Sequence, residues 1–272
     1  MIWVIGDIHG CFYTLKKLLS SIEEIDSNPQ YVFIGDYTDR GNYSKQVVDL
    51  IIDLVSKGHK AIRGNHDDLI DLILNNSCKG DVSYFMSGEV SQRNAVRYWL
   101  QHGLYQTLIS YGFDKDKLDS LIAKELYTEI QKTFYTLCPE NHRKFINELP
   151  IFWENDKNFV LHGFLNIVTE IPRFGLNNIV KNKETYTAAL WDRPIMNLNF
   201  IETVKPKWNK FGVFGHTPTI ILQKNDPILT DYLCLLDTGV CFSKPENDCG
   251  LSAICLENKK IIKIKTERKD VD

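Results

Sequence analysis

Three short clusters near the N-terminus combine glycine with side chains that can bind metal ions or transfer protons. They are residues 6–10 (GDIHG), 35–41 (GDYTDRG) and 63–67 (RGNHD). In an extended turn, residues two apart point the same way, so Asp7 and His9 can direct a carboxylate oxygen and an imidazole nitrogen to one point. The flanking glycines permit tight turns and close approach of other groups. Taken alone, this first cluster also fits a strand-end turn with a solvated Asp and a helix-capping His.

The second cluster sets two carboxylates and a guanidinium group between glycines. Asp36 is a candidate to bridge two metal ions, Arg40 to grip phosphate oxygens through its planar fork, and Asp39 to orient a neighbouring acid. The alternative is a surface salt bridge, which contributes little to stability.

The third cluster places an amide oxygen and an imidazole on adjacent residues, Asn65 and His66. Adjacent side chains point in different directions, so one can ligate a metal ion while the other faces a substrate. The alternative for Asn65 is the N-cap of a helix.

The seven histidines differ in whether an apolar, strand-like run precedes them. Four of the seven come after such a run and sit at or near glycine: His9, His66, His162 and His216. A single histidine beside a strand is more often structural than a ligand. The remaining three follow no predicted strand and are interpreted as surface or packing residues: His59, His102 and His142. If His66 faces a substrate, three histidines, two carboxylates and one amide oxygen are available to bind metal, with no thiolate among them. These donors suit manganese, iron or zinc, and their number fits two ions.

The elements that position these clusters alternate between strand and helix over residues 2–76. Apolar runs predict strands, and each is followed by a polar cluster and a stretch with helical periodicity. The alternation predicts a βαβαβα unit with parallel strands, whose carboxyl ends gather ligands. The predicted strands are 2–5, 31–34 and 61–62, and the predicted helices are 11–25, 44–57 and 67–76.

The pattern then changes. Long amphipathic stretches at 90–101, 114–137 and 140–149 predict a helical segment at about 80–150, either a flank that completes the core or a cap that shapes substrate access. The charged tail after Lys265 is expected to fray. Short apolar runs return after Pro150 and predict a second, mostly antiparallel layer. These runs are 151–153, 159–161, 210–214, 232–236, 251–256 and 260–264.

Bulk composition limits the classes of protein. The 272 residues, 43% hydrophobic and 25% charged, fit one domain over 1–272, and a net charge of −3 offers no basic footprint for nucleic acid. Seven scattered cysteines without a CxxC pair form neither a disulfide framework nor a zinc ribbon, so we expect a reducing compartment. The chain enters a strand directly after Met1, and no stretch approaches 18 apolar residues. We therefore expect a cytoplasmic protein with no membrane partner.

The motifs GDxHG, GDxxDRG, GNH(D/E), an isolated HG and GHTP, in this order, resemble the phosphoprotein phosphatase branch of the calcineurin-like metallophosphoesterases. The resemblance runs from Gly6 to about Leu256. It is closest to bacterial and phage serine/threonine phosphatases of the bacteriophage lambda phosphatase type, also at residues 98–100, 191–193 and 237–239. Such a likeness implies an α/β fold, a β-sandwich of two mixed sheets flanked by helices, with a dinuclear metal site at the carboxyl ends of strands.

The resemblance also implies roles for individual residues. His66 matches the family's general acid, paired with Asp39, and Arg40 with Arg193 would clamp the phosphoryl oxygens. The match around Arg193 is short, and a packed Trp191 beside a surface arginine is the alternative. The implied cofactors are two divalent metal ions, manganese foremost, with iron or zinc as alternatives. The first ion would be held by Asp7, His9 and Asp36, and the second by Asp36, Asn65, His162 and His216.

The implied activity is hydrolysis of phosphate monoesters in a phosphorylated protein or peptide, by attack of a metal-bridging hydroxide. Asp67 stands where the phosphatases commonly carry Glu, which favours a nucleotide polyphosphate, as in the symmetrical diadenosine tetraphosphatases. The intact Asp39-Arg40 pair favours the protein phosphatase. The alternative function is therefore a symmetrical diadenosine tetraphosphatase or related nucleotide pyrophosphohydrolase. The acidic balance argues against a nuclease.

Overall fold

The apolar runs near the N-terminus form the centre of the first of two sheets. The computed structural model describes residues 1–83, 89–164, 176, 183–193, 205–243 and 247–272. Its first sheet has the strand order β10-β9-β1-β2-β3, in which β1 pairs with β2, and β2 with β3, in parallel. β9 and β10 form an antiparallel hairpin beside β1. The strands are β1 (Ile2–Ile5), β2 (Gln30–Phe33), β3 (Lys60–Ala61), β9 (Gly250–Cys255) and β10 (Ile261–Lys265).

The second sheet is parallel at its centre and antiparallel at its edges. Its order is β4-β5-β6-β8-β7, with β5, β6 and β8 parallel and the outer strands antiparallel. The prediction of a mostly antiparallel second layer is therefore wrong, because β5, β6 and β8 run in the same direction and the last two predicted strands join the first sheet. Two mixed sheets, as the family resemblance implies, are confirmed. The strands are β4 (Phe152–Glu154), β5 (Asn158–Leu161), β6 (Phe211–Phe214), β7 (Ile228–Leu229) and β8 (Leu233–Leu235).

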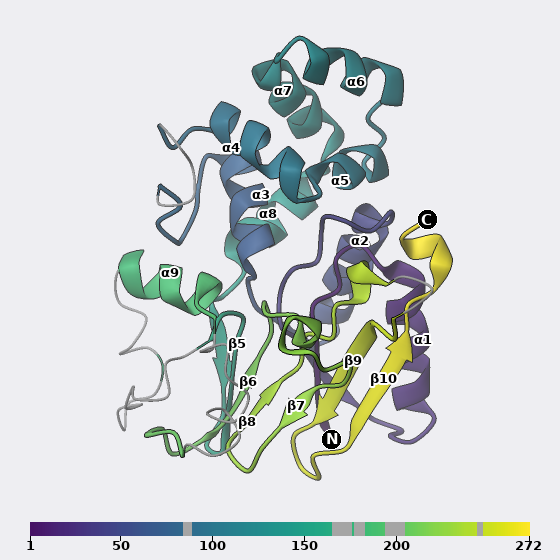
Figure 1. The fold of residues 1–272 in the computed structure, drawn as a ribbon, viewed down its shortest axis with the longest axis vertical. Coiled ribbons are helices and arrows are strands. Elements are labelled where there is room, and N and C mark those ends of the chain that lie inside the picture. Colours follow the sequence, from purple (N-terminus) through teal and green to yellow (C-terminus); the bar gives the residue numbers. More distant parts are fainter. Residues whose placement is uncertain (84–88, 165–175, 177–182, 194–204, 244–246) are drawn as a thin grey trace.

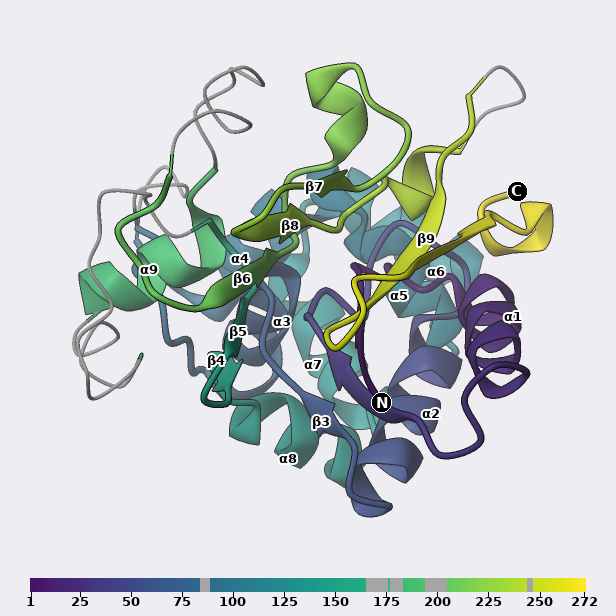
Figure 2. The ribbon, with the colours of Figure 1, turned by 90° about the horizontal axis from the view of Figure 1, so that it is seen from below.

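Alternation along the strands divides the core into layers. Trp3 and Ile5 point to one face of β1, where α1 (Phe12–Glu23) and α2 (Ser44–Ser56) cover the first sheet (Figure 2). Val4 points to the opposite face, into the apolar layer between the two sheets. Successive side chains of a strand leave opposite faces, so a strand covered on both sides must be apolar throughout. The sandwich therefore holds the strand ends in a rigid frame.

The helical segment, defined as helices α4–α8 (residues 92–148), stacks on α3 above the sheets (Figure 1). It has an apolar core of its own that includes Trp99, Leu108 and Phe134. The predicted 114–137 helix is in fact two helices, because the chain turns at Glu125, where φ is +55°. α5 was not predicted. The helices are α3 (Asn65–Asn75), α4 (Gln92–Trp99), α5 (Leu104–Ser110), α6 (Lys115–Ala123), α7 (Tyr127–Leu137) and α8 (Glu140–Glu148), with a 3₁₀ turn η1 (Leu100–His102).

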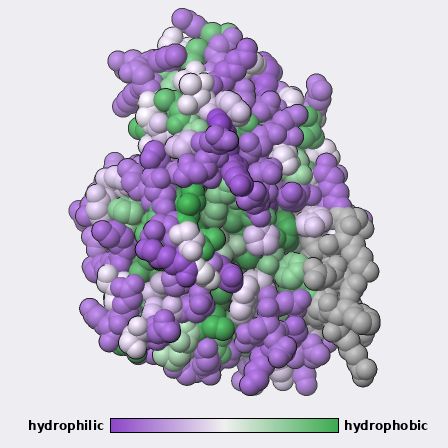
Figure 3. All heavy atoms as spheres, turned by 180° about the vertical axis from the view of Figure 1, so that it is seen from behind, coloured by the Kyte–Doolittle hydropathy of each residue, from purple (hydrophilic) through white to green (hydrophobic). Residues whose placement is uncertain are grey.

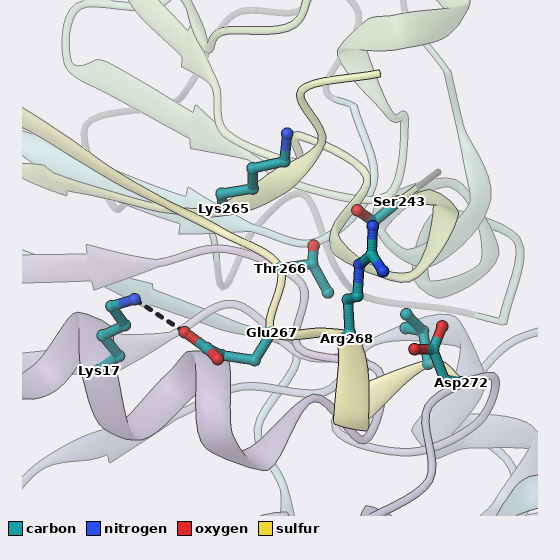
Figure 4. A pocket seen from close by; sticks show the side chains of 8 residues that line it. Lys17, Ser243, Lys265, Thr266, Glu267, Arg268 and Asp272 are labelled. Atoms are coloured by element: carbon teal, nitrogen blue, oxygen red, sulfur yellow. Dashed lines mark hydrogen bonds and ion pairs between the residues drawn. The ribbon is translucent and has the colours of Figure 1, made fainter. Parts of the chain in front are cut away.

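The C-terminal tail is anchored rather than frayed. Asp270 is fully buried and accepts hydrogen bonds from the backbone N–H of Thr14 at 2.8 Å and from its hydroxyl at 2.7 Å. These contacts lie in the first turn of α1, where backbone N–H groups lack partners within the helix and favour a carboxylate. An ion pair of 2.8 Å between Lys17 and Glu267 closes the same region (Figure 4). The expectation of fraying after Lys265 is therefore wrong.

The surface seen in Figure 3 is mainly hydrophilic, with hydrophobic residues gathered toward the middle of that face. Among the described residues, none of the helices combines the length and the apolar character needed to cross a membrane. The apolar sides of the helices are used in packing, as the buried leucines of α1 illustrate with Leu15 and Leu18.

Candidate metal and phosphate site

Six side chains from five strand-end loops meet at one edge of the sandwich. They follow β1, β2, β3, β5 and β6, which are parallel within each sheet, so their carboxyl ends lie together. Each side chain is buried, with at most 7% of its residue exposed. The structure thus brings together the whole predicted ligand set: Asp7, His9, Asp36, Asn65, His162 and His216.

Asp36 lies at the centre of this cluster. Its Oδ2 is 3.5 Å from His9 Nε2, and its Oδ1 is 3.4 Å from His162 Nε2. Two groups of possible metal ligands share Asp36: one with His9 and His66, the other with Asp7 and His162. This is the position that a carboxylate bridging two ions would take. His66, predicted as an acid, also approaches Asp36, with Nε2 3.9 Å from Oδ2.

Two histidine rings are held by backbone carbonyl groups in the manner of metal-ligating imidazoles. His9 Nδ1 lies 3.0 Å from the carbonyl oxygen of Thr38, and His162 Nδ1 lies 3.0 Å from that of Ile34. A carbonyl can only accept, so Nδ1 donates and Nε2 presents a lone pair to the cluster. His162 Nε2 then faces a carboxylate oxygen of Asp36, which also only accepts, whereas His9 Nε2 faces both Asp36 and a donor, Arg40 Nη1.

The same conflict surrounds the amide oxygen of Asn65. His162 Nε2 lies 2.8 Å from Asn65 Oδ1, and His216 Nδ1 lies 2.9 Å from it. His216 Nε2 is 3.0 Å from the carbonyl oxygen of Trp191, which fixes the proton of His216 on the far side of the ring. Lone pairs that converge in a buried space repel one another unless a proton or cation lies between them. The donor set therefore fits divalent cations.

The carboxylate of Asp7 also has a buried acceptor atom that a cation would satisfy. Its Oδ2 accepts the backbone N–H of His216 at 2.9 Å, whereas its buried Oδ1 has no hydrogen-bond partner among the described residues. Burial raises the pKa of Asp7, and the neighbouring carboxylate of Asp237 raises it further. A nearby cation would satisfy the orphaned oxygen and offset the repulsion.

Electrostatic coupling ties Asp36 to His162. Burial opposes ionisation of Asp36, but the facing His162 and His66 imidazoles hold its pKa well below the usual range. Burial likewise opposes a charge on His162, yet Asp36 and Asp7 raise its pKa to about 9. A positive charge is favoured at this point of the cluster, whether carried by a proton or by a metal ion.

Unusual backbone conformations aim these side chains. Five of the nine non-glycine residues with positive φ in the described ranges belong to this site. Each such residue costs on the order of 1–3 kcal/mol and persists only where the surroundings enforce it. Glycine permits the close approaches: a Cβ at Gly64 would lie 2.2 Å from Asp36 Oδ1, and one at Gly215 would lie 2.2 Å from Asp7 Oδ1. The five residues are His9, Asp36, Asp39, Arg40 and His216.

The predicted acid pair has the expected geometry. His66 Nδ1 lies 2.7 Å from Asp39 Oδ2, so the ring donates to the carboxylate and Nε2 faces Arg40 Nη2 at 3.0 Å. Burial raises the pKa of Asp39 to about 7, against hydrogen bonds from Thr107 and Trp99 and the charge of Arg40. Burial also lowers the pKa of His66, while the carboxylate of Asp36 raises it. The pair is poised beside the metal-ligand cluster.

Two arginines line the mouth of the site. Arg40 Nη1 lies 2.7 Å from His9 Nε2, and its guanidinium group stacks over the Phe242 ring at 5.1 Å. Arg193 Nη1 donates to the carbonyl oxygen of His216 at 3.1 Å. Both arginines border a cavity of about 250 Å³, together with His66. Two guanidinium groups around one small cavity suit an anion with several oxygens, such as a phosphoryl group.

Aromatic rings form one wall of this cavity, and three of them come from segments 98–100 and 191–193, which carry the family resemblance. Tyr98, His102 and Trp191 line it together with Trp99. The ring centroids of Tyr98 and His102 are 4.6 Å apart, and those of Trp99 and His102 are 5.0 Å apart. His102, interpreted as a surface or packing residue, thus borders the site, and Trp191 arrives on α9 (Lys183–Trp191), a helix that was not predicted. His102 carries no local signal for a site.

Asp237 is a further buried group that the predicted set lacks. It follows β8, is 3% exposed, and burial raises its pKa to about 6. The backbone N–H of Gly239 donates to its carboxylate at 2.8 Å. The signal was present, since an apolar run followed by Asp and Gly is the pattern that marked the first cluster.

Asp67 holds the loops and does not face the cavity. It is fully buried and accepts the backbone N–H groups of Asp36 and Gly64 at 2.8 Å each, and that of Tyr37 at 3.2 Å. A carboxylate engaged by three donors has little left for a substrate. The exchange of Glu for Asp at this position therefore changes loop packing rather than a direct substrate contact.

Comparisons with known proteins agree with this geometry. A family model described as calcineurin-like phosphoesterase matches residues 1–220. Over 258 residues the chain is 27% identical to the asymmetrical bis(5'-nucleosyl)-tetraphosphatase PrpE of Oceanobacillus iheyensis, covering 88% of this chain and 84% of that protein. Over 67 residues it is 45% identical to the catalytic subunit of serine/threonine-protein phosphatase 6 of Caenorhabditis elegans, covering 24% of this chain and 20% of that protein.

A solved structure titled as a putative diadenosine tetraphosphatase has the same fold. It aligns over 98% of this chain and 93% of its own, with a TM-score of 0.53 and 17% identity. The family model spans most of the chain, and the strand-end cluster supplies candidate ligands for the metal ions on which the family depends. The protein is a hydrolase that belongs to the calcineurin-like phosphoesterase family.

Proposed function

We propose that this protein is a phosphatase that hydrolyses phosphate monoesters of phosphorylated proteins with the help of two divalent cations. One cation would be held by Asp7, His9 and Asp36, and the other by Asp36 together with Asn65, His162 and His216. Manganese is the proposed metal, because the donors are nitrogen and oxygen atoms without thiolate. When bound, the ions supply an activated water as nucleophile and neutralise charge on the phosphoryl group.

The arginines would bind and orient the phosphoryl group. Arg40 and Arg193 both border the cavity, so their planar forks would hold the non-bridging oxygens and keep the phosphorus in line for attack. Both guanidinium groups remain charged at any physiological pH. Their contribution to rate is then mainly electrostatic and positional.

The observation that carries the choice of substrate is the 2.7 Å contact between His66 Nδ1 and Asp39 Oδ2. A seryl or threonyl alkoxide is a poor leaving group and needs a proton as it departs. The imidazolium form of His66, whose Nδ1–H is held by Asp39, would give that proton from Nε2. A nucleotide phosphate, whose second pKa is about 6, departs with much less need of an acid. A buried, oriented acid therefore favours phosphate monoesters of alcohols.

A nucleotide polyphosphate is the second candidate substrate. The relative that aligns over most of the chain carries the name of an asymmetrical tetraphosphatase. The aromatic wall of Tyr98, Trp99 and His102 would also suit a nucleobase, because every base offers a π face to an aromatic ring. The family resemblance in the sequence suggested a symmetrical tetraphosphatase, whereas this relative is named as an asymmetrical one. Both activities would use the same metal site.

A substrate panel tests the proposal. Purified, manganese-loaded protein would be assayed on a phosphoserine peptide, a phosphotyrosine peptide and diadenosine tetraphosphate, with release of phosphate or nucleotide as the readout. We expect kcat/KM for the phosphoserine peptide to exceed that for diadenosine tetraphosphate by at least about tenfold, or 1.4 kcal/mol. A preference of that size for the dinucleotide would establish the second candidate instead.

We also propose a cellular compartment for the protein. Seven cysteines, all free thiols in the structure, support a reducing compartment, and we propose the cytoplasm. We also propose that residues 1–272 form one domain, whose helical segment borders the site.

A further inference from the structure

The helical segment reaches the acid pair with two buried polar side chains. Trp99, the last residue of α4, is 1% exposed, and Thr107 of α5 is fully buried. Both contact Asp39, which is itself fully buried. The proposed mechanism gives neither of them a role, and packing alone would explain a buried tryptophan.

Hydrogen bonds engage both oxygens of the Asp39 carboxylate. The indole N–H of Trp99 donates to Oδ2, the oxygen that also receives His66 Nδ1. The Thr107 hydroxyl donates to Oδ1 at 2.7 Å and accepts the backbone N–H of Asp39 at 2.9 Å. The hydroxyl of Ser44, 3.1 Å from Thr107 Oγ1, can donate to it in turn. The carboxylate therefore cannot rotate without breaking a buried hydrogen bond.

Trp99 also restrains the imidazole. The rings of His66 and Trp99 meet edge to face, with centroids 4.5 Å apart and an interplanar angle of 61°. One residue thus sets both the hydrogen-bond acceptor of His66 and the plane of its ring. Proton transfer depends steeply on such alignment, because the donor must lie within hydrogen-bond reach of the leaving oxygen.

We propose that Trp99 and Thr107 are positioning residues that hold the Asp39–His66 pair, so that the helical segment takes part in proton donation to the leaving group. This inference rests on the proposed function, in which the Nε2–H bond of the His66 imidazolium breaks and the proton passes to the leaving oxygen as the P–O bond breaks. The Nδ1–H stays hydrogen-bonded to Asp39. Water then returns a proton to Nε2. The helical segment is in this respect part of the catalytic apparatus and not only a cover.

Two conservative variants test the proposal. Trp99→Phe keeps an aromatic ring but removes the N–H, and Thr107→Val keeps the shape but removes the hydroxyl. Each would be assayed on a phosphoserine peptide, whose leaving group needs an acid, and on 2,4-dinitrophenyl phosphate, whose leaving group does not. We expect kcat on the peptide to fall about 10- to 100-fold, the usual cost of losing a supporting hydrogen bond. On dinitrophenyl phosphate kcat should change less than about threefold, with KM unchanged on both.

Trp208→Phe is the matched control. Trp208 is also buried, at 4% exposed, but it packs against Phe159 and Phe214, and its indole N–H has no acceptor within the described part of the chain. This variant should lose no leaving-group selectivity. Equal losses on both substrates for Trp99→Phe, or no loss on either, would overturn the positioning role, because misfolding and loss of metal do not depend on the leaving group.

A double-mutant cycle separates this inference from the function on which it rests. In a His66→Asn background, Trp99→Phe should cost nothing further on the peptide, since the proton donor is already gone. A full additional loss would show that Trp99 acts elsewhere, and metal content and urea midpoints of all variants would be measured alongside. If His66→Asn itself lowers both substrates equally, the proposed acid fails. If only Trp99→Phe does so, the positioning role alone fails.

Discussion

The strand-end loops and the helical segment serve the site in different ways. The loops bring charged groups and ligands on glycine-bounded turns, with backbone strain at residues such as Asp36 and His216. The helical segment brings neutral donors and aromatic rings, such as Trp99 and Thr107, from unstrained helices. Charge in a buried site requires close approach and special backbone geometry, whereas support for that charge requires only a well-packed helix face. The two kinds of contribution should respond differently to substitution.

The largest effect is expected on the loop side. Asp36→Ala removes the carboxylate shared by both ligand groups. Activity on p-nitrophenyl phosphate should fall at least about 10³-fold, the upper end of what losing one electrostatic contact costs. Bound metal, measured by mass spectrometry, should fall with it. Asp53→Ala is the control, because Asp53 pairs with Lys57 on the surface, and its kcat should stay within about twofold. Retained metal in Asp36→Ala would remove Asp36 from the bridging position.

His66 lies between the two regions, and its loss should be intermediate. His66→Asn should lower kcat on a phosphoserine peptide about 10²- to 10⁴-fold, because the leaving alkoxide loses its proton donor. Metal content should be unchanged. His66 Nε2 is 3.9 Å from Asp36 Oδ2, so loss of metal in this variant would identify His66 as a ligand instead of an acid.

A substitution where the two regions meet should lower the stability of the protein. Arg63 is fully buried, pairs with Asp68 at 3.0 Å and Asp71 at 2.9 Å on α3, and donates to the carbonyl oxygens of Ile146 and Asn147 at the end of α8. Arg63→Met leaves two buried carboxylates without their partner. The free energy of unfolding, measured with urea, should fall by about 3–5 kcal/mol.

An exposed ion pair calibrates the Arg63 result. Lys57→Met breaks the 2.7 Å pair with Asp53, in which both side chains are more than half exposed. This change should cost less than about 1 kcal/mol. If Arg63→Met costs no more than Lys57→Met, the buried contacts of Arg63 do not hold α8 of the helical segment to the sandwich.

The smallest expected effect is the change in stability when metal is removed at different pH values. Burial raises the pKa of Asp7 and brings that of Asp237 to about 6, against an ordinary 3.8. The folded metal-free protein therefore binds these protons more tightly than the unfolded chain. The stability that results is complete below about pH 4 and is lost as pH rises through about 6.

Divalent cations can replace those protons. The melting temperature of the metal-loaded protein should exceed that of EDTA-treated protein by a margin that widens from pH 5 to pH 8. Each kcal/mol corresponds to about 2–4 °C at this chain length, and calorimetry at several pH values measures it. A margin that narrows as pH rises would contradict the linkage.

Sequence patterns located strands better than they located pairing. β1, β5 and β9 lie within a residue of the predicted runs, because buried strands must be apolar on both faces. The direction of the second sheet differs from the prediction, although its central strands β5, β6 and β8 are buried on both faces, as is typical of parallel strands. α9 was missed as well, although it places Trp191 at the cavity.

The amino-acid sequence by itself determined which charged side chains stand at strand ends, because glycine-bounded turns and apolar runs are local features. The tertiary structure alone decided what supports them. Trp99 and Thr107 lie 60 and 68 residues from Asp39 along the chain, and no local pattern links positions so far apart. Asp67 is the opposite case. Its residue type suggested an influence on substrate choice, but in the structure its carboxylate accepts three backbone N–H groups and holds the loops together.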